Sequence, residues 1–138
     1  MTDINLLTGA DLAFIGDAYY ELQIRNHVLD KGITKLWELH NKCVEYVSRD
    51  SQYLIIKTIE NELTNEEQNI FKRGRNYNYK NKSVEYVYAS GFEAIIGFLY
   101  LKQDYERLEY IIRKAIKIIE ETNEKEIKWK NMFMAKTQ

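Results

Sequence analysis

Apolar residues recur at intervals of three and four along most of the chain, which is the pattern of amphipathic helices. The first such stretch runs to about Asp30, with Thr8 as its expected N-cap and Asp11 as the capping-box partner. Gly32 then provides a C-terminal stop for this helix. Further helices are predicted over about 34–48 and 50–59, from 64, over 83–101 and from 104.

The sequence also predicts N-caps and buried faces for the later helices. Asp50 or Ser51 is the expected cap of the third helix, and Thr64 with Glu67 predicts a capping box at the fourth. Residues 71–82 break the helical pattern, and their glycine, asparagines and tyrosines favour a loop or a frayed helix end. The second helix is expected to bury Leu36, Leu39, Cys43, Tyr46 and Val47.

Composition also favours an all-α fold. The chain has no proline, which interrupts helix interiors, and its six glycines are few for an all-β protein with many tight turns. A length of 138 residues fits one domain with a core of its own, so we expect a single domain over residues 1–138. Residues 123–138 form a charged tail, and its expected docking residues are Ile127, Trp129, Met132 and Phe133.

Charge and cysteine content narrow the possible partners and compartments. A net charge of −1 argues against a protein that binds polyanions over its whole surface, so any nucleic-acid contact must come from a local patch. Cys43 is the only cysteine, which excludes an internal disulfide and indicates a reducing compartment. We expect neither a signal peptide nor a membrane span, because the N-terminus lacks a basic region before an apolar run and no stretch of about 18 apolar residues exists. These features predict a cytoplasmic protein.

Two acidic residues, Asp17 and Glu93, lie alone within otherwise apolar helical stretches. An unpaired carboxylate costs several kcal/mol or more to bury, so each needs a partner or access to water. An ion pair with a lysine or arginine is the commoner solution, and a cation shared by the two carboxylates is the alternative. Gly16 and Gly97 stand near them on the same helices, and a glycine inside a helix usually marks the close approach of another backbone or a ligand.

The residues around these carboxylates resemble a known family. Residues 12–18, LAFIGDA, resemble the ribonuclease III signature, in which an acidic residue, an aromatic residue, an apolar residue, Gly and Asp run in that order. Residues 92–97, FEAIIG, resemble the second acidic helix of that family, Glu-Ala-x-x-Gly. The spacing of the motifs, the basic segment between them and the lack of a double-stranded-RNA-binding domain resemble the Mini-III subfamily. The resemblance covers roughly residues 7–115 and implies the ribonuclease III endonuclease-domain fold, with about six to seven helices, in a homodimer.

The chain departs from the wider ribonuclease III pattern at three acidic positions, which are occupied by Ala10, Ala13 and Ser90. Mini-III proteins share this thinner set of acidic residues. The resemblance implies that Asp17 and Glu93 are the catalytic residues and the metal ligands, and that the ion is Mg²⁺, with Mn²⁺ as a substitute. The number of metal ions stays open, because a second ion would need RNA oxygens or other ligands.

Two further residues near the signature each have two interpretations. Glu21 lies one turn after Asp17 and is either an outer ligand or, more commonly at this spacing, an ion-pair partner of Arg25. Phe14 is either an ordinary core residue or, as the family resemblance implies, a knob that enters a socket on the partner subunit of a homodimer.

Basic residues gather between the two motifs. Residues 72–82 contain five basic residues and no acidic one, with Tyr77 and Tyr79 among them. This segment is either a solvated loop or a surface for the phosphates and 2′-hydroxyls of A-form RNA. The Mini-III resemblance implies an RNA-binding set of His40, Lys42, Ser48, Arg49, Gln52, Lys72, Arg73, Arg75, Asn76, Lys80 and Lys82.

The resemblance therefore implies a metal-dependent endoribonuclease that cleaves double-stranded RNA and leaves 5′-phosphate and 3′-hydroxyl ends. It also implies a task in the maturation of 23S ribosomal RNA, with a ribosomal protein as a further partner. Two alternatives stay open, namely a non-catalytic RNA-binding helical dimer with a degenerate site, and a helical protein-interaction module that binds no RNA.

Overall fold

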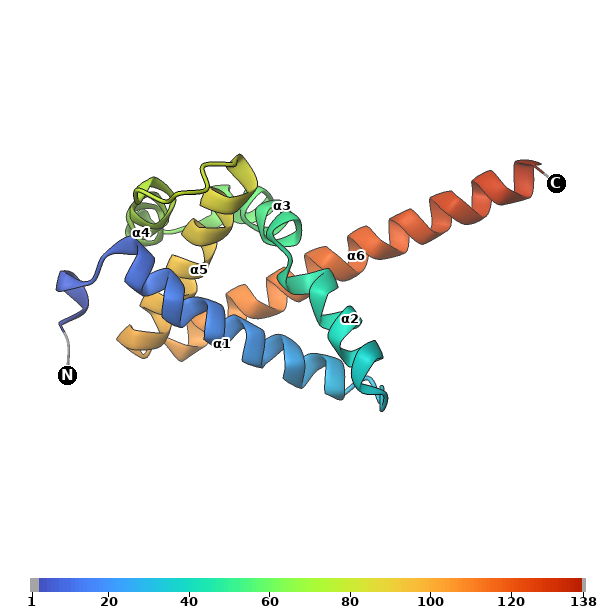
Figure 1. Ribbon diagram of the computed structural model, residues 1–138, viewed down its shortest axis with the longest axis horizontal. Coiled ribbons are helices and arrows are strands. Elements are labelled where there is room, and N and C mark those ends of the chain that lie inside the picture. The colour runs from blue at the N-terminus through green and yellow to red at the C-terminus, as the bar shows by residue number, and fades with distance from the viewer. Residues whose placement is uncertain (1–2, 138) are drawn as a thin grey trace.

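The computed structural model describes residues 3–137, so the outermost residues of the predicted domain, at 1, 2 and 138, lie outside it. The described part consists of helices joined by short connections and contains no strand, which confirms the all-α fold (Figure 1). Its two short 3₁₀ helices are η1 (Ile4–Leu6) and η2 (Glu60–Glu62). Its six α-helices are α1 (Gly9–Leu29), α2 (Leu36–Val47), α3 (Arg49–Ile59), α4 (Asn65–Asn76), α5 (Val84–Lys102) and α6 (Tyr105–Thr137).

Helix α5 forms the centre of the protein, with α1, α3, α4 and α6 packed around it (Figure 1). Its residues are buried without interruption from 89 to 99. Among the described helices, α5 alone is long and apolar enough to cross a membrane, and 61% of that stretch is buried inside the protein. Its apolar composition is explained by its place in the core.

Helices α1 and α5 touch through their main chains at Gly16 and Gly97. A Cβ atom at Gly16 would lie 1.8 Å from the carbonyl oxygen of Glu93, and one at Gly97 would lie 1.9 Å from that of Leu12. No side chain fits at either position, so the predicted close approach of another backbone is confirmed. Because Asp17 directly follows Gly16, this contact brings the two acidic motifs together.

The helix starts agree with the sequence at two places and differ at a third. Thr8 and Thr64 both form the predicted capping boxes, with Asp11 and Glu67 respectively. The cap of α3 is Ser48, whose side chain accepts a hydrogen bond from the backbone N–H of Ser51. The prediction of Asp50 or Ser51 was therefore wrong, because α2 ends earlier than expected and both residues lie in the first turn of α3.

The break predicted over residues 71–82 begins too early, because α4 continues to Asn76. The buried face of this helix includes Ile70, Phe71 and Gly74. A Cβ atom at Gly74 would lie 2.6 Å from Cβ of Ala94, so a glycine occupies an interior position where α4 meets α5. Since glycine does not count as apolar in a periodicity analysis, it concealed the last turns of the helix.

An apolar groove of about 730 Å³ lies between α1 and α2. Leu36 and Trp37 line it, and Leu36 is 81% exposed, so the prediction that Leu36 lies inside was wrong. The side chain stands at the first turn of α2, where it borders the groove instead of entering the core. Together with Leu29 from α1, these residues give the α1–α2 face an unusually apolar surface.

The charged tail is helical, and the last turns of α6 project away from the body of the protein (Figure 1). Ile127, Trp129, Met132 and Phe133 are all exposed, so the predicted docking of the last turn was wrong. The rings of Trp129 and Phe133 instead stack on one another, with their centroids 5.7 Å apart. These side chains contact each other because they lie four residues apart on one helix.

Candidate active site

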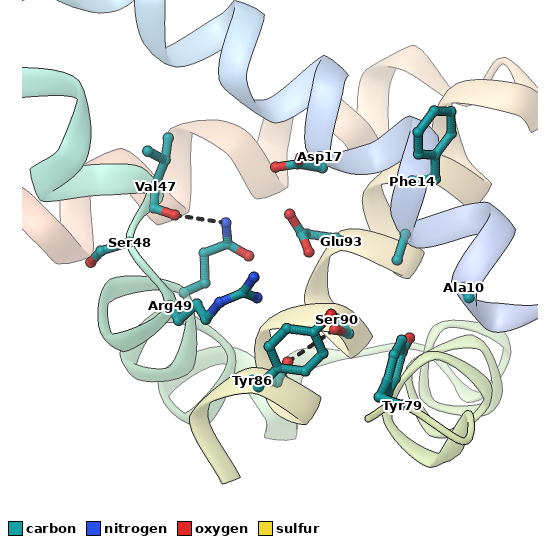
Figure 2. A pocket seen from close by; sticks show the side chains of 12 residues that line it. Ala10, Phe14, Asp17, Val47, Ser48, Arg49, Tyr79, Tyr86, Ser90 and Glu93 are labelled. Carbon is teal, nitrogen blue, oxygen red and sulfur yellow. Dashed lines mark hydrogen bonds between the residues drawn. The ribbon is translucent and has the colours of Figure 1, made fainter. Parts of the chain in front are cut away.

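The two lone carboxylates point toward one another across the contact between α1 and α5 (Figure 2). Both line a cavity of about 460 Å³, in which Glu93 is only 9% exposed while Asp17 is open to the solvent. Neither carboxylate has a lysine or arginine partner within 4.0 Å in the described part of the chain. The ion-pair explanation for these two residues is therefore not supported.

The surroundings of Glu93 favour its protonated form. Burial, and then the hydrogen bond and negative charge of Asp17, raise the pKa of Glu93 from 4.5 to about 9, while Gln52 and Arg49 oppose the shift. Without a cation, the pair therefore retains a proton at neutral pH. A divalent cation between the two groups would remove the repulsion that the proton now relieves.

The three positions where the wider family has further acidic residues face the same cavity. Ala10, Ala13 and Ser90 all line it, and the Ser90 hydroxyl donates to the Tyr86 carbonyl at 2.9 Å. In the described part of the chain, no group of three or more His, Cys, Asp or Glu residues could hold a metal ion. The protein thus offers two carboxylates, which suits an ion that keeps several of its waters, as Mg²⁺ does.

A buried acceptor in the same cavity supports a hydrated cation. Gln52 lines the cavity and is 3% exposed, and its Nε2 donates to the Val47 carbonyl at 3.1 Å. Its Oε1 is buried and accepts no hydrogen bond. A cation that carries water molecules would supply donors to this oxygen, so the residues present fit such a group.

Arg49 is the positively charged side chain that lines the cavity. It is exposed, and its guanidinium lies over the Tyr86 ring, 4.0 Å from the centroid (Figure 2). Stacking on an aromatic face orients a guanidinium and leaves its N–H groups free to bind an anion. A phosphate group that enters the cavity would therefore meet a positive charge beside the two carboxylates.

The predicted RNA-binding residues of α2 and α3 fall into two groups. Ser48, Arg49 and Gln52 line the cavity, whereas His40 lines the α1–α2 groove. Lys42 lies outside the cavity and pairs with Glu45 at 2.9 Å. The RNA-binding roles of His40 and Lys42 stay predictions that the cavity does not support.

Glu21 also lies outside the cavity. Arg25 donates to its carboxylate at 3.1 Å, so the ion-pair interpretation of Glu21 is confirmed, and the cavity lining gives the outer-ligand interpretation no support. This pair borders the α1–α2 groove instead.

The basic segment spans the end of α4 and the loop that follows. Arg73 donates to the Leu7 carbonyl, and the Arg75 guanidinium lies 5.4 Å from the Phe71 ring centroid. Lys82 donates to Asn78 at 3.3 Å. The remaining members of the predicted set, Lys72, Asn76 and Lys80, are exposed.

Tyr79 connects this loop to the cavity, and sequence reasoning did not assign it to the site. Its hydroxyl donates to the Gly74 carbonyl at 2.7 Å, and its ring lies 5.3 Å from that of Tyr86. The only signal in the sequence was the presence of aromatic residues among the basic ones. Tyr79, Tyr86 and Val47 are the lining residues that the sequence prediction did not single out.

Comparison with known proteins identifies the family. The ribonuclease III domain matches residues 10–104. The chain is 41% identical over 127 residues to Mini-ribonuclease 3 of Streptococcus pneumoniae, covering 87% of this chain and 99% of that one. It is 42% identical over 132 residues to the Mini-ribonuclease 3 of Enterococcus faecalis, covering 91% of this chain and all of that one.

A solved structure agrees with this assignment. The crystal structure of protein FN1578 from Fusobacterium nucleatum has a TM-score of 0.76 and 38% sequence identity to this chain, and the match covers 85% of this chain and 98% of that one. Ribonuclease III enzymes act on double-stranded RNA and generally work as dimers. The chain therefore belongs to the ribonuclease III family, within its Mini-III group, and is an endoribonuclease.

Proposed function

We propose that this endoribonuclease cleaves double-stranded RNA with a divalent cation held by Asp17 and Glu93. The cation is Mg²⁺, and Mn²⁺ is expected to substitute for it. The observation that carries the proposal is the convergence of two carboxylates, without a lysine or arginine partner, in a cavity where Glu93 is buried. Such a pair repels unless a proton or a cation lies between its members.

The residues of the cavity suit hydrolysis of a phosphodiester. A bound divalent cation supplies positive charge to the scissile phosphate and lowers the pKa of a coordinated water. Asp17 and Glu93 fix the place of the ion, and the Arg49 guanidinium binds a non-bridging phosphate oxygen. Attack by water at phosphorus, with loss of the 3′-oxygen, leaves the 5′-phosphate and 3′-hydroxyl ends that the family resemblance implies.

A homodimer with the α1–α2 face in its interface is part of the proposal. Phe14 is 82% exposed, far more than a core phenylalanine, which supports its role as a knob that enters the partner subunit. Leu22, Leu29 and Trp37 are also exposed on the same two helices. Burying such an apolar surface in a twofold interface would place one site on each strand of an RNA duplex.

The RNA surface would extend from the cavity to the basic segment. Lys72 and Lys80 are exposed, and Tyr79 holds the loop against the end of α4. Positive charge beside the site suits the closely spaced phosphates of a duplex. We propose the predicted set of RNA-binding residues as a whole, with Gln52, which is buried, acting without direct contact to the RNA. His40 and Lys42 lie outside the cavity, as the basic residues of that segment do.

The cellular role follows from the resemblance to Mini-III proteins. We infer that the enzyme acts in the cytoplasm as a single catalytic domain and matures 23S ribosomal RNA, with a ribosomal protein as a further partner. The lone cysteine, Cys43, is a buried free thiol, which agrees with a reducing compartment.

Cleavage of a plain RNA duplex tests the proposal. The wild-type protein should cut the duplex in Mg²⁺ and not in EDTA, while Asp17→Asn and Glu93→Gln should bind the duplex without cutting it. Glu126→Gln, which alters an exposed carboxylate on α6, should cut normally and serves as the control. A Glu93→Gln variant with a near-normal rate would remove Glu93 from the mechanism, and a wild type that binds RNA without cutting it would favour the non-catalytic dimer.

A further inference from the structure

The amide oxygen of Gln52 is a buried polar group without a partner. In the described part of the chain it is the one buried side-chain nitrogen or oxygen that makes no hydrogen bond. Such a group costs about 1–3 kcal/mol, and native structures rarely leave one unexplained. Gln52 lines the same cavity as Asp17 and Glu93, which suggests that the missing partner belongs to the bound state.

The orientation of this amide is fixed by the start of α3. The Nε2 group of Gln52 donates to the Val47 carbonyl at 3.1 Å, which Figure 2 marks with a dashed line. An exchange of the amide nitrogen and oxygen would set two acceptors against each other, so Oε1 is the atom left without a partner. Arg49, which precedes Gln52 on the same helix, is exposed and also lines the cavity.

Helix α4 contains the same contact without a cavity. Gln68 is the fourth residue of α4, as Gln52 is of α3, and its Nε2 donates to the Leu63 carbonyl at 3.4 Å. Gln68, however, is exposed, so water can satisfy its oxygen. The contact to the preceding carbonyl is therefore a general feature of these helix starts, and the buried oxygen is specific to Gln52.

We propose that Gln52 is a positioning residue whose Oε1 accepts a hydrogen bond from a water in the hydration shell of the cation held by Asp17 and Glu93. The inference rests on the proposed function. An amide oxygen accepts hydrogen bonds and carries no charge, so it orients such a water without competing with the carboxylates for the ion. Because Gln52 is 3% exposed, it acts beneath the RNA and not as a contact to it.

Metal affinity in the absence of RNA tests this role. Gln52→Met keeps the size of the side chain and removes the acceptor, and Gln68→Met removes the same backbone contact away from the site. Outer-shell partners of metal sites are typically worth 10–100-fold in affinity. We expect calorimetry on the full chain to show Mg²⁺ binding weakened by at least about tenfold in Gln52→Met and unchanged in Gln68→Met.

Two controls separate positioning from folding and from RNA binding. In EDTA, Gln52→Met should unfold at a temperature no lower than Gln68→Met, and it should bind an RNA duplex as tightly as the wild type. If Gln52→Met folds poorly, Gln52→Leu provides the same comparison. At saturating Mg²⁺ the variant should recover part of its cleavage rate, because the ligands themselves are intact.

Three results would contradict the inference. Unchanged Mg²⁺ affinity in both Gln52 variants would remove the residue from the metal site. A loss of RNA affinity in EDTA would make Gln52 a direct RNA contact instead. If the wild type and Gln52→Met bind Mg²⁺ and cleave RNA equally well, this inference alone is overturned. If the wild type neither binds Mg²⁺ nor cleaves RNA, the proposed function is overturned as well.

Discussion

Replacing Glu93 by Gln should stabilise the metal-free protein, and the gain should grow with pH. The folded state holds the pKa of Glu93 near 9, against an ordinary value of 4.5. Between these values the unfolded chain releases the proton while the folded protein keeps it, so rising pH favours unfolding. Glutamine cannot ionise, so the free energy of unfolding of the variant does not decrease with pH for this reason.

The size of the effect follows from the shift. Each pH unit above 4.5 costs the wild type about 1.36 kcal/mol, until the folded group itself ionises near pH 9. At about pH 7.5 the cost is about 4 kcal/mol, and at about pH 5 it is under about 1 kcal/mol. A difference of about 4 kcal/mol is a large part of the stability of a domain of this size.

Urea unfolding in EDTA at these two pH values measures the difference. The wild type and Glu93→Gln should be compared at one protomer concentration, because the proposed dimerisation would contribute to stability. Glu126→Gln, on the exposed surface of α6, should show no such pH dependence. Added Mg²⁺ should stabilise the wild type and not Glu93→Gln, because only the wild type retains both ligands.

Two outcomes would refute this reasoning. If Glu93→Gln is equally stabilising at both pH values, ionisation of Glu93 is not the cause. If it is destabilising at about pH 7.5, the carboxylate makes favourable contacts in the folded state that outweigh its burial.

Four further predictions concern the metal, the dimer, the RNA surface and the helix contact. The affinity for Mg²⁺ should increase roughly tenfold for each unit by which the pH is raised, up to about pH 9, because the ion displaces the proton of Glu93. Calorimetry in two buffers should show about one proton released on binding. Phe14→Ser should weaken the dimer by at least about 100-fold in sedimentation experiments, since a twofold dimer buries two of these side chains at about 1.5–3 kcal/mol each; unchanged sedimentation would place the interface elsewhere. Joint replacement of Lys72, Lys80 and Lys82 by Gln should weaken RNA binding and lower the salt slope by about 0.9 for each phosphate that the loop no longer neutralises, and an unchanged slope would remove the loop from the interface. Gly97→Ala should cost about 1–3 kcal/mol or more in urea unfolding, because its Cβ would lie 1.9 Å from the Leu12 carbonyl oxygen; a stable variant would mean that the helices can separate.

Local chemistry made much of the fold predictable. The capping boxes at Thr8 and Thr64 depend on a few adjacent residues, and both form as expected. The lone charges at Asp17 and Glu93 pointed to the cavity, because a carboxylate in an apolar helix needs a partner or access to water. The glycine before Asp17 correctly indicated a close approach between backbones.

The errors arose where a tertiary contact or an exposed surface overrides the pattern. Gly74 is buried against α5 but is not apolar, so the end of α4 was missed. Leu36 and Trp129 are apolar but exposed, because one borders a groove and the other lies on the projecting part of α6. The burial of Gln52 and its unpaired oxygen could not be predicted, since neither can be inferred from a polar residue in a helix.

The main-chain contact between Gly16 and Gly97 also bears on how this enzyme can change over time. Two backbones that already touch set the distance between Asp17 and Glu93, so this distance is inherited with the fold and does not change gradually as side chains are exchanged. A descendant could lose activity in a single step, by replacement of Asp17 or Glu93, and still keep the same architecture. We therefore expect inactive relatives of this chain to differ at an acid and to retain both glycines.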